Sequence, residues 1–286
     1  LVQYRLQFGE KEKLPKALLF PATSYQDYLL RAHIYQGKGL PSADDNGMSD
    51  PFLEIRMGNQ KKLTSVMPET LYPRWYETQE MTVRLPTNHE MRPDISIMVY
   101  DQDMFSTDFL GRFTVPSKTI QPKFNPDPQW RDVMVGDEED QMQEGQILCS
   151  FQLMKMAEVP RVREKGDFGP EAPDHIRPEL FPCKFEVLII GVRNLEPYNL
   201  LDIGNPIVEM DGGERPPTGF PRTEPGSGPH ASFLEQIVLD IDLPMKTIFA
   251  PNINVRVFDD RVLGEVLVGN TSIPVAPYMT VSGCLI

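Results

Sequence analysis

The strongest constraint on the fold is the alternation of apolar and polar residues in many short runs, each bounded by turn-forming residues such as Gly, Pro, Asn and Asp. The runs recur at intervals of about 8–12 residues, and a period of two is typical of strands with one buried face. The 28 Pro and 20 Gly residues interrupt any long helical pattern. The pattern therefore predicts an all-β protein built from antiparallel β-sandwiches.

The runs fall into two sets, separated by a segment without periodicity. The first set predicts eight strands, and the second is one or two strands short of a complete sandwich. The first strands are expected near residues 28–36, 52–57, 63–66, 77–85, 95–100, 110–115, 130–135 and 145–154. The second set is expected near residues 185–192, 207–210, 233–241, 253–258 and 265–268.

The aperiodic segment 157–180 is rich in Pro and charge, which predicts a linker. We therefore divide the chain into an extension or the end of a preceding module (1–24), a first domain (25–156), the linker, and a second domain (181–286) that we expect to be truncated. Asp50-Pro51 and Val99–Asp101 are matched in the same order by Asn205-Pro206 and Val257–Asp259. This indicates an internal repeat of roughly 155 residues.

The net charge of the chain argues against two classes of function. A formal net charge of −13 argues against a nucleic-acid binder and against a permanently basic membrane binder. No apolar stretch approaches the roughly 18 residues that a membrane span needs. The three Cys residues are far apart, which favours reduced thiols in the cytosol. The chain opens at Leu1 rather than Met, so we interpret it as a piece of a longer protein.

The candidate functional residues lie in two acidic loops at predicted strand ends. The loop at 40–51 holds Asp44 and Asp50, and the loop at 100–111 holds Asp101, Asp103 and Asp108. If both loops lie at one end of the sandwich, their carboxylates repel each other and raise each other's pKa. Ca²⁺ relieves such crowding, because it accepts six to eight oxygen ligands in flexible geometry, whereas Mg²⁺ demands a rigid octahedron and Zn²⁺ favours Cys and His. The alternative is that Asp, Asn, Gly and Ser are here only because they form turns.

The first domain resembles a C2 domain in its SDPF run at 49–52, its YDQD run at 100–103 and its DFLG run at 108–111. The closing strand near 145–154 resembles that of the permuted, type II-like C2 topology with eight strands. The resemblance implies Ca²⁺ ligands from the carboxylates of Asp44, Asp50, Asp101, Asp103 and Asp108 and from the carbonyls of Asp45 and Gln102. The interval from Asp101 to Asp108 is one residue shorter than the commonest C2 pattern.

Together, the two sets resemble adjacent C2 domains from the later half of a ferlin over nearly the whole chain from Tyr28, including residues 173–213 and 250–269. The resemblance implies a tail-anchored parent protein on the cytoplasmic face of a vesicle or of the plasma membrane. It also implies a role in Ca²⁺-dependent vesicle fusion, exocytosis or membrane repair. The expected partners are anionic phospholipids, with other domains of the parent chain or fusion-machinery proteins, and no nucleic acid.

The second domain differs at the matching positions, where it has Asn199, Asn205, Asp259 and Arg261. One carboxylate beside an arginine is a poor ligand set for Ca²⁺. We therefore expect a Ca²⁺-independent scaffold or partner surface, with Arg261 as an ordinary solvated turn residue.

The first domain is expected to act as a switch, because bound Ca²⁺ inverts the charge of the acidic cleft and attracts lipid phosphate. Met104 and Phe105 at the second loop, and Met48 in the first, are the expected membrane contacts. Two alternatives remain. Both domains could be a scaffold in which any ion only stiffens the loops, or the chain could accompany an enzyme whose chemistry lies elsewhere. The chain itself shows no catalytic motif, such as G-x-S-x-G or a P-loop, and is not expected to be an enzyme.

Overall fold

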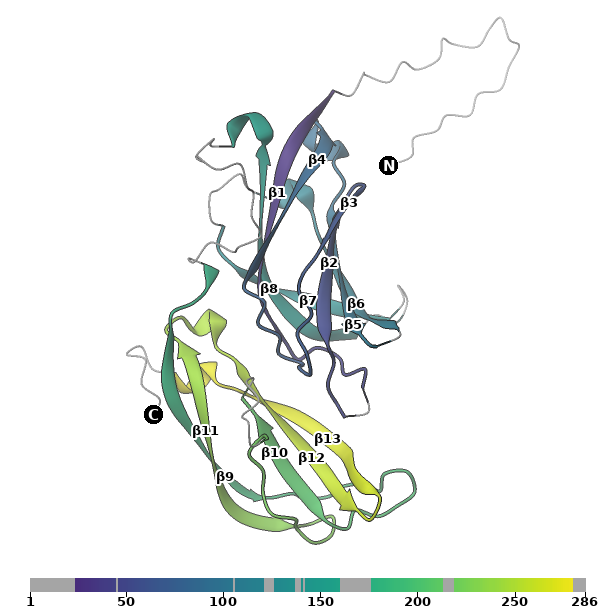
Figure 1. Ribbon diagram of the computed structural model, residues 1–286, viewed down its shortest axis with the longest axis vertical. Coiled ribbons are helices and arrows are strands. Elements are labelled where there is room, and N and C mark those ends of the chain that lie inside the picture. The colour runs from purple at the N-terminus through teal and green to yellow at the C-terminus, as the bar shows by residue number, and fades with distance from the viewer. Residues whose placement is uncertain are drawn as a thin grey trace, which may run out of the picture.

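The computed structural model describes residues 24–44, 46–104, 106–120, 126–136, 140, 142–159, 176–212 and 219–279. The chain is all-β, as expected, and is drawn in Figure 1. The predicted extension and most of the predicted linker lie outside the described residues. The proposed domain boundaries stay a prediction, so we call residues 24–159 the first half and residues 176–279 the second half.

The strands of the first half are β1 (Tyr25–Lys38), β2 (Pro51–Met57), β3 (Gln60–Leu63), β4 (Glu77–Pro86), β5 (Ile95–Gln102), β6 (Thr107–Val115), β7 (Gln129–Val135) and β8 (Met142–Lys155). Those of the second half are β9 (Leu180–Gly191), β10 (Pro206–Asp211), β11 (Ser232–Pro244), β12 (Asn252–Arg261) and β13 (Gly264–Pro274). Short 3₁₀ turns occupy η1 (His89–Met91), η2 (Ser117–Thr119), η3 (Met156–Glu158), η5 (Thr247–Phe249) and η6 (Ala276–Tyr278). Among the described residues, no helix has the length and apolar character that crossing a bilayer requires.

The first half is a sandwich of eight antiparallel strands. They are hydrogen-bonded in the order β3-β2-β5-β6-β7-β8-β1-β4, and β8 lies beside β1 as the permuted topology predicts. Ile34 of β1, Ile55 of β2, Ile97 of β5 and Ile147 of β8 are all buried in one core. Because strands from both ends of the hydrogen-bonded order bury residues in the same core, the sheet folds over on itself and encloses it.

The second half has two smaller sheets over a second core. β10, β12 and β13 form one sheet, and β11 and β9 form the other. Met210 and Ile253 from the first sheet pack with Ile237 and Leu239 from the second. The described residues of this half therefore hold five strands in two layers, rather than the eight strands of a full sandwich.

Strand positions agree with the sequence pattern except at β3, which was expected at 63–66, and at the end of β13, which was expected near 268 and continues to Pro274. The β2–β3 hairpin pairs Met57 with Gln60, so only Gly58 and Asn59 form its turn. Gly58 adopts φ +58°, a left-handed conformation that tight hairpins need and that glycine adopts without steric cost. The turn therefore starts the strand three residues earlier than expected.

The two halves contact each other. The Gln36 side-chain amide donates a hydrogen bond to the Phe249 carbonyl at 3.2 Å, and the rings of Tyr35 and Phe249 lie 5.5 Å apart. The Arg74 guanidinium donates to the Gly212 carbonyl at 3.3 Å. Gly47 packs so closely on Leu267 that a Cβ added there would overlap its Cδ2 atom. The first acidic loop is thus held against the second half.

Candidate metal site

Strand pairing brings the two acidic loops together at one end of the first half. β2 and β5 are antiparallel neighbours, with Pro51 opposite Asp101. The Asp50 N–H donates to Asp101 Oδ1, and the Gln102 N–H donates to the Asp50 carbonyl at 3.1 Å. The end of the first loop therefore lies beside the start of the second, as the sequence predicts.

Three carboxylates converge there. Asp44, Asp101 and Asp103 each present one oxygen, and these oxygens lie within 4.8 Å of one another. Asp101 is only 1% exposed, and its Oδ2 atom is buried without a hydrogen-bond partner. A buried polar atom without a partner costs free energy, and this oxygen is the atom of the cluster that a ligand would satisfy.

The electrostatics of Asp101 agree with that interpretation. Burial raises the pKa of Asp101 above its ordinary value, and the hydrogen bond from the Asp50 N–H only partly opposes this. The negative charges of Asp103, Asp50 and Asp108 raise the pKa of Asp101 further. A cation at this point would remove both the repulsion and the unsatisfied oxygen.

Asp50 and Asp108 lie near the three-carboxylate group without being part of it. Asp50 Oδ1 accepts a hydrogen bond from the Glu69 N–H at 2.6 Å, and Asp108 lies opposite Asp101 in the β5–β6 ladder. The Gln102 side chain donates to the Asp103 carbonyl at 2.9 Å and so braces the second loop. Asp45, the remaining predicted ligand, lies outside the described residues.

Two glycines shape the loops. Gly111 has φ +153° and a Cβ there would lie 2.5 Å from Val133 Cγ1, so only glycine fits. Gly111 of β6 pairs with Val99 of β5, and a β-bulge follows, since the next residue of β5, Tyr100, pairs with Phe109. This shift in register places Asp101 opposite Asp108. In the first loop, Gly47 has φ +77°. The tight backbone there turns the chain between Asp44 and the start of β2.

Two residues that sequence reasoning missed support the site. The Glu69 N–H binds the Asp50 carboxylate, and the Ser106 hydroxyl donates to Asp103 Oδ2 at 2.9 Å. Ser106 lies inside the second acidic loop, three residues after Asp103, so the sequence could have indicated that its hydroxyl reaches the Asp103 carboxylate. Glu69 belongs to the segment between β3 and β4, and no pattern in the sequence links it to Asp50.

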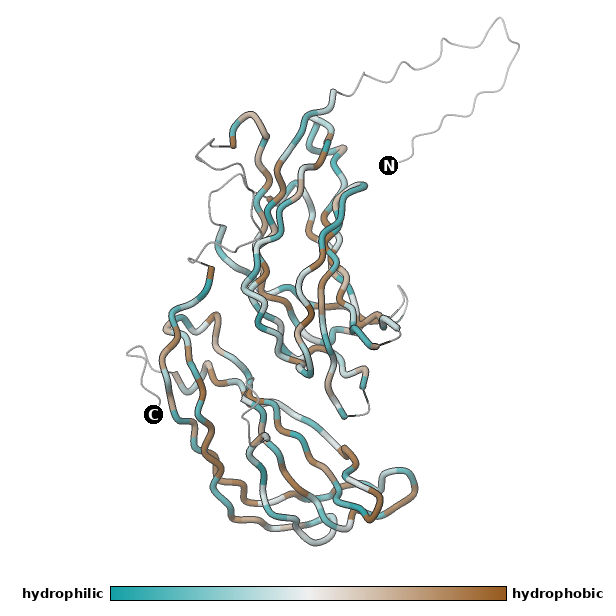
Figure 2. The backbone as a smooth tube through the Cα atoms, in the orientation of Figure 1, coloured by the Kyte–Doolittle hydropathy of each residue, from teal (hydrophilic) through white to brown (hydrophobic). Residues whose placement is uncertain are grey.

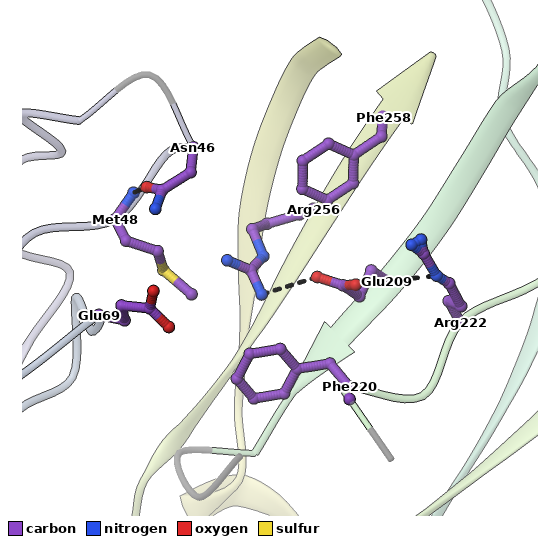
Figure 3. Close-up of a pocket in the computed structure, with 9 residues that line it drawn as sticks. Asn46, Met48, Glu69, Glu209, Phe220, Arg222, Arg256 and Phe258 are labelled. Carbon is purple, nitrogen blue, oxygen red and sulfur yellow. Dashed lines mark hydrogen bonds and ion pairs between the residues drawn. The ribbon is translucent and has the colours of Figure 1, made fainter. Parts of the chain in front are cut away.

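The expectation that Met48 contacts a membrane is wrong. Met48 is 2% exposed and packs with Leu71 and Tyr72, and Phe220 of the second half packs against this cluster. Figure 3 shows Met48 pointing across a pocket toward Arg256. Met104, in contrast, is 88% exposed. Phe105 lies outside the described residues.

The second half repeats the arrangement with one decisive difference. Pro206 lies opposite Asp259 as Pro51 lies opposite Asp101, which confirms the matched landmarks. Asp259 Oδ1 accepts the backbone N–H groups of Gly204 at 3.0 Å and Asn205 at 2.9 Å. Its Oδ2 accepts the Arg261 Nε–H at 2.7 Å. Both carboxylate oxygens are therefore satisfied by the chain itself.

Arg261 is not the solvated turn residue that we expected, since its side chain is 17% exposed and paired with Asp259. Burial alone would raise the pKa of Asp259, but the Arg261 guanidinium and the two backbone N–H groups outweigh it and hold the pKa below its ordinary value. The guanidinium provides the positive charge that the first half lacks.

Comparison with known proteins identifies the fold family. A family model of the C2 domain matches residues 28–133. Mouse Fer-1-like protein 4 is 29% identical, over 89% of this chain and 14% of its own length. Ferlin 1 of Toxoplasma gondii is 26% identical, over 83% of this chain and 16% of its own length. Mouse myoferlin is 25% identical, over 83% of this chain and 12% of its own length.

Solved structures are similar at lower identity. A structure of two C2 domains of extended synaptotagmin 2 aligns over 96% of this chain and 88% of that chain, with 19% identity and a TM-score of 0.36. This chain spans less than a fifth of the length of the curated relatives that it matches. The first half therefore matches the C2-domain family, and the chain is similar to ferlins over most of its length.

Proposed function

We propose that the first half binds Ca²⁺ and that ion binding attaches the chain to a phospholipid surface. The observation that carries this proposal is the buried Asp101 Oδ2 atom, which has no hydrogen-bond partner and lies among the carboxylates of Asp44 and Asp103. The donor set is made only of oxygens and lies on loops, which suits Ca²⁺ better than Zn²⁺ or Mg²⁺.

Asp44, Asp101 and Asp103 would hold the ion, and Asp50 and Asp108 would add negative charge around it. The bound ion supplies positive charge at a loop end that otherwise repels anionic headgroups. Met104 projects into solvent beside Asp103 and is free to enter the interfacial region of a bilayer. Phe105 stays a predicted contact next to it. We propose anionic phospholipids as the partner of this end.

For the second half we propose a role that does not need Ca²⁺. Asp259 is already satisfied by Arg261, Gly204 and Asn205, so an added cation would gain no unpaired carboxylate there. In the parent protein, we propose that this chain acts as a binding module rather than an enzyme. It would work on the cytoplasmic face of a vesicle or of the plasma membrane, in fusion, exocytosis or repair.

A scaffold is the second candidate function, and the docked first loop favours it. Gly47 and Met48 rest on the second half, so an ion at Asp44 would also stiffen the contact between the halves. In this case Ca²⁺ would raise the stability of the chain without producing lipid binding.

Vesicle co-sedimentation separates the two candidates. Vesicles of phosphatidylcholine with phosphatidylserine are mixed with the chain in Ca²⁺ or in EDTA. The wild type should pellet more in Ca²⁺ than in EDTA, and the Asp101→Asn, Asp103→Asn double variant should show no such increase. Asp27→Asn, an exposed change on β1 away from the cluster, is the matched control and should behave as wild type.

Each outcome has a different meaning. Thermal stabilisation by Ca²⁺ without an increase in pelleting would support the scaffold. An equal increase in pelleting with Ca²⁺ for wild type and double variant, or no thermal shift in millimolar Ca²⁺, would refute the Ca²⁺ switch.

A further inference from the structure

The sheet of β9 and β11 exposes an apolar patch on its outer face, the side away from the core of the second half. The members of the patch are Leu188, Ile190, Leu234 and Val238, which are 60%, 63%, 70% and 40% exposed. They alternate along their strands with residues that pack against the core, so they point to the opposite side of the sheet. Figure 2 shows hydrophobic brown along β9, whose residues 187–190 are all apolar.

Strand register gives this patch a counterpart in the first half. β1 pairs His33 with Thr78, and β9 pairs Leu188 with Gln236. Leu188 follows His33 by 155 positions and Gln236 follows Thr78 by 158, in line with the internal repeat in the sequence. The two sheets are therefore equivalent, with β9 in the place of β1 and β11 in the place of β4.

An unusual backbone conformation supports this match. Tyr76, just before β4, and Leu234 at the start of β11 are equivalent, and both have left-handed backbone, with φ of +49° and +54°. Few residues other than glycine adopt this conformation, because it crowds the Cβ atom. Tyr35 and Ile190 are equivalent in the same way on β1 and β9. The patch therefore corresponds to the surface of the first half that carries Tyr35 and Tyr76.

In the first half, a turn of the second half covers that surface. The ring of Tyr35 lies 5.5 Å from the ring of Phe249, and Tyr76 packs against the same cluster. Phe249 belongs to η5, and its carbonyl accepts a hydrogen bond from the Gln36 amide at 3.2 Å. Tyr35 is consequently only 6% exposed, whereas Ile190 is 63% exposed. The same place on the sandwich is thus an interface in the first half and is exposed to solvent in the second.

The first half also carries the counterpart of the covering turn. η1 joins β4 to β5 as η5 joins β11 to β12, and Met91 of η1 stands in the place of Phe249. Met91 is 54% exposed. β5 begins beside η1 and ends at the acidic loops, of which the first is held against the second half. η1 therefore lies at the far end of the first half, away from the patch of its own chain, and Figure 1 shows the two halves end to end along the longest axis.

We propose that the apolar patch of one copy of this chain docks the η1 turn of a second copy, so that copies associate head to tail. The contact would repeat the one between the halves, with Met91 in the place of Phe249 and the patch in the place of Tyr35 and Tyr76. Such a contact is heterologous, because it joins two different surfaces and leaves one free patch and one free turn at the ends.

The surroundings of the patch fit a protein partner. On the same face, Lys184 pairs with Asp240 at 3.1 Å, and the Gln236 amide donates to the Glu186 carboxylate at 3.2 Å. Exposed polar groups around an apolar centre are the usual rim of a protein interface. The second copy supplies the matching apolar turn, so the chain holds both parts of the contact.

Sedimentation velocity of the full chain tests the proposal, from micromolar to millimolar concentration. It is run in EDTA without lipid, so that the result does not rest on the proposed Ca²⁺ site or on a membrane. The wild type should gain mass as the concentration rises. The face variant (Ile190→Asp, Leu234→Asp) and the turn variant (Met91→Asp) should each weaken association at least about tenfold, since burying one such side chain changes an equilibrium by about that factor or more.

The Val262→Asp, Leu263→Asp double variant is the matched control for the face variant. It adds the same charge to two other fully exposed apolar residues of the second half. The position equivalent to Val262 is Met104, which is 88% exposed and so takes no part in the contact between the halves. The control should associate as the wild type does, and thermal melting should show that all variants are folded.

A mixture of the two variants tests the head-to-tail arrangement. The face variant keeps its turn and the turn variant keeps its patch, so together they should form a dimer of one copy of each that grows no further. Association of the turn variant as strong as that of the wild type would show a contact that does not use η1 and would overturn the proposal. A wild type that stays monomeric at millimolar concentration, or a face variant that associates equally well, would overturn it too.

Discussion

Without Ca²⁺, the Asp101→Asn variant should be more stable than the wild type. With Ca²⁺ bound, it should be less stable than the wild type. The substitution keeps the shape of the side chain and an oxygen that accepts the Asp50 N–H. It removes one negative charge from a group in which the carboxylate oxygens lie within 4.8 Å of one another. It also places an amide NH₂ where the buried Oδ2 atom has no partner, close to carboxylates that accept hydrogen bonds.

The magnitude follows from the spacing. Two unit charges 4.8 Å apart repel by about 0.9 kcal/mol in a medium like water, and by about 3.5 kcal/mol at an effective dielectric constant near 20. Asp44 and Asp103 are only half-buried, so the gain should lie toward the lower end. We expect about 1–2 kcal/mol in the free energy of unfolding without Ca²⁺, or a rise in Tm of about 2–8 °C.

Ca²⁺ should reverse the order. At a concentration about one hundred times its Kd, a ligand that binds only the folded state adds about 2.7 kcal/mol to the wild type, and the variant should gain little of this. Thermal melting of both proteins in EDTA and in Ca²⁺ measures the four values, with Asp27→Asn as the control. A variant less stable than wild type in EDTA would show that Asp101 is not under repulsion, and equal stabilisation of both proteins by Ca²⁺ would show that the cluster is not the site.

Three further predictions concern the same geometry. The folded-state pKa of Asp101 is raised, so the folded protein binds more protons than the unfolded chain between about pH 3.9 and that raised value. In EDTA the wild type should therefore approach Asp101→Asn in stability as the pH falls from about 7 through this window, which urea unfolding at several pH values measures. Arg261→Ala leaves Asp259 buried with only its backbone partners, and should cost about 2–3 kcal/mol in urea unfolding that Ca²⁺ does not restore. Phe220→Ala removes the ring that covers Met48, and should speed hydrogen exchange at the Met48 N–H; unchanged exchange would show that the docked loop does not need this contact.

Much of the fold could be predicted from the sequence, because alternation reports which face of a strand is buried. Ile95 and Ile97 alternate with partly exposed residues along β5 and both lie in the core. The position of β3 could not be predicted in this way, since a turn of Gly58 and Asn59 sets it and the short strand buries no side chain of its own. Periodicity thus predicts buried strands well and short exposed strands poorly.

The candidate site was predictable as far as it depends on strand ends, and not where it depends on the second half. Asp101 and Asp103 follow directly from the end of β5, and the β2–β5 pairing brings Asp50 beside them. Met48 has the sequence context of an exposed loop residue. Its burial depends on Phe220, which is more than 150 residues away in a segment without periodicity. A contact between two halves leaves no local pattern in either of them.

The residue two positions after a shared aspartate gives the two halves opposite charge at this point. Asp101 and Asp259 both lie at the end of a central strand and both accept the backbone N–H of the residue before a proline, Asp50 or Asn205. Two residues later the first half has Asp103, which adds negative charge, and the second half has Arg261, which cancels it. The same backbone frame therefore produces one loop end with crowded carboxylates and one that carries its own cation. On the proposed function, only the first end would respond to Ca²⁺, and the second would keep the same charge at any ion concentration.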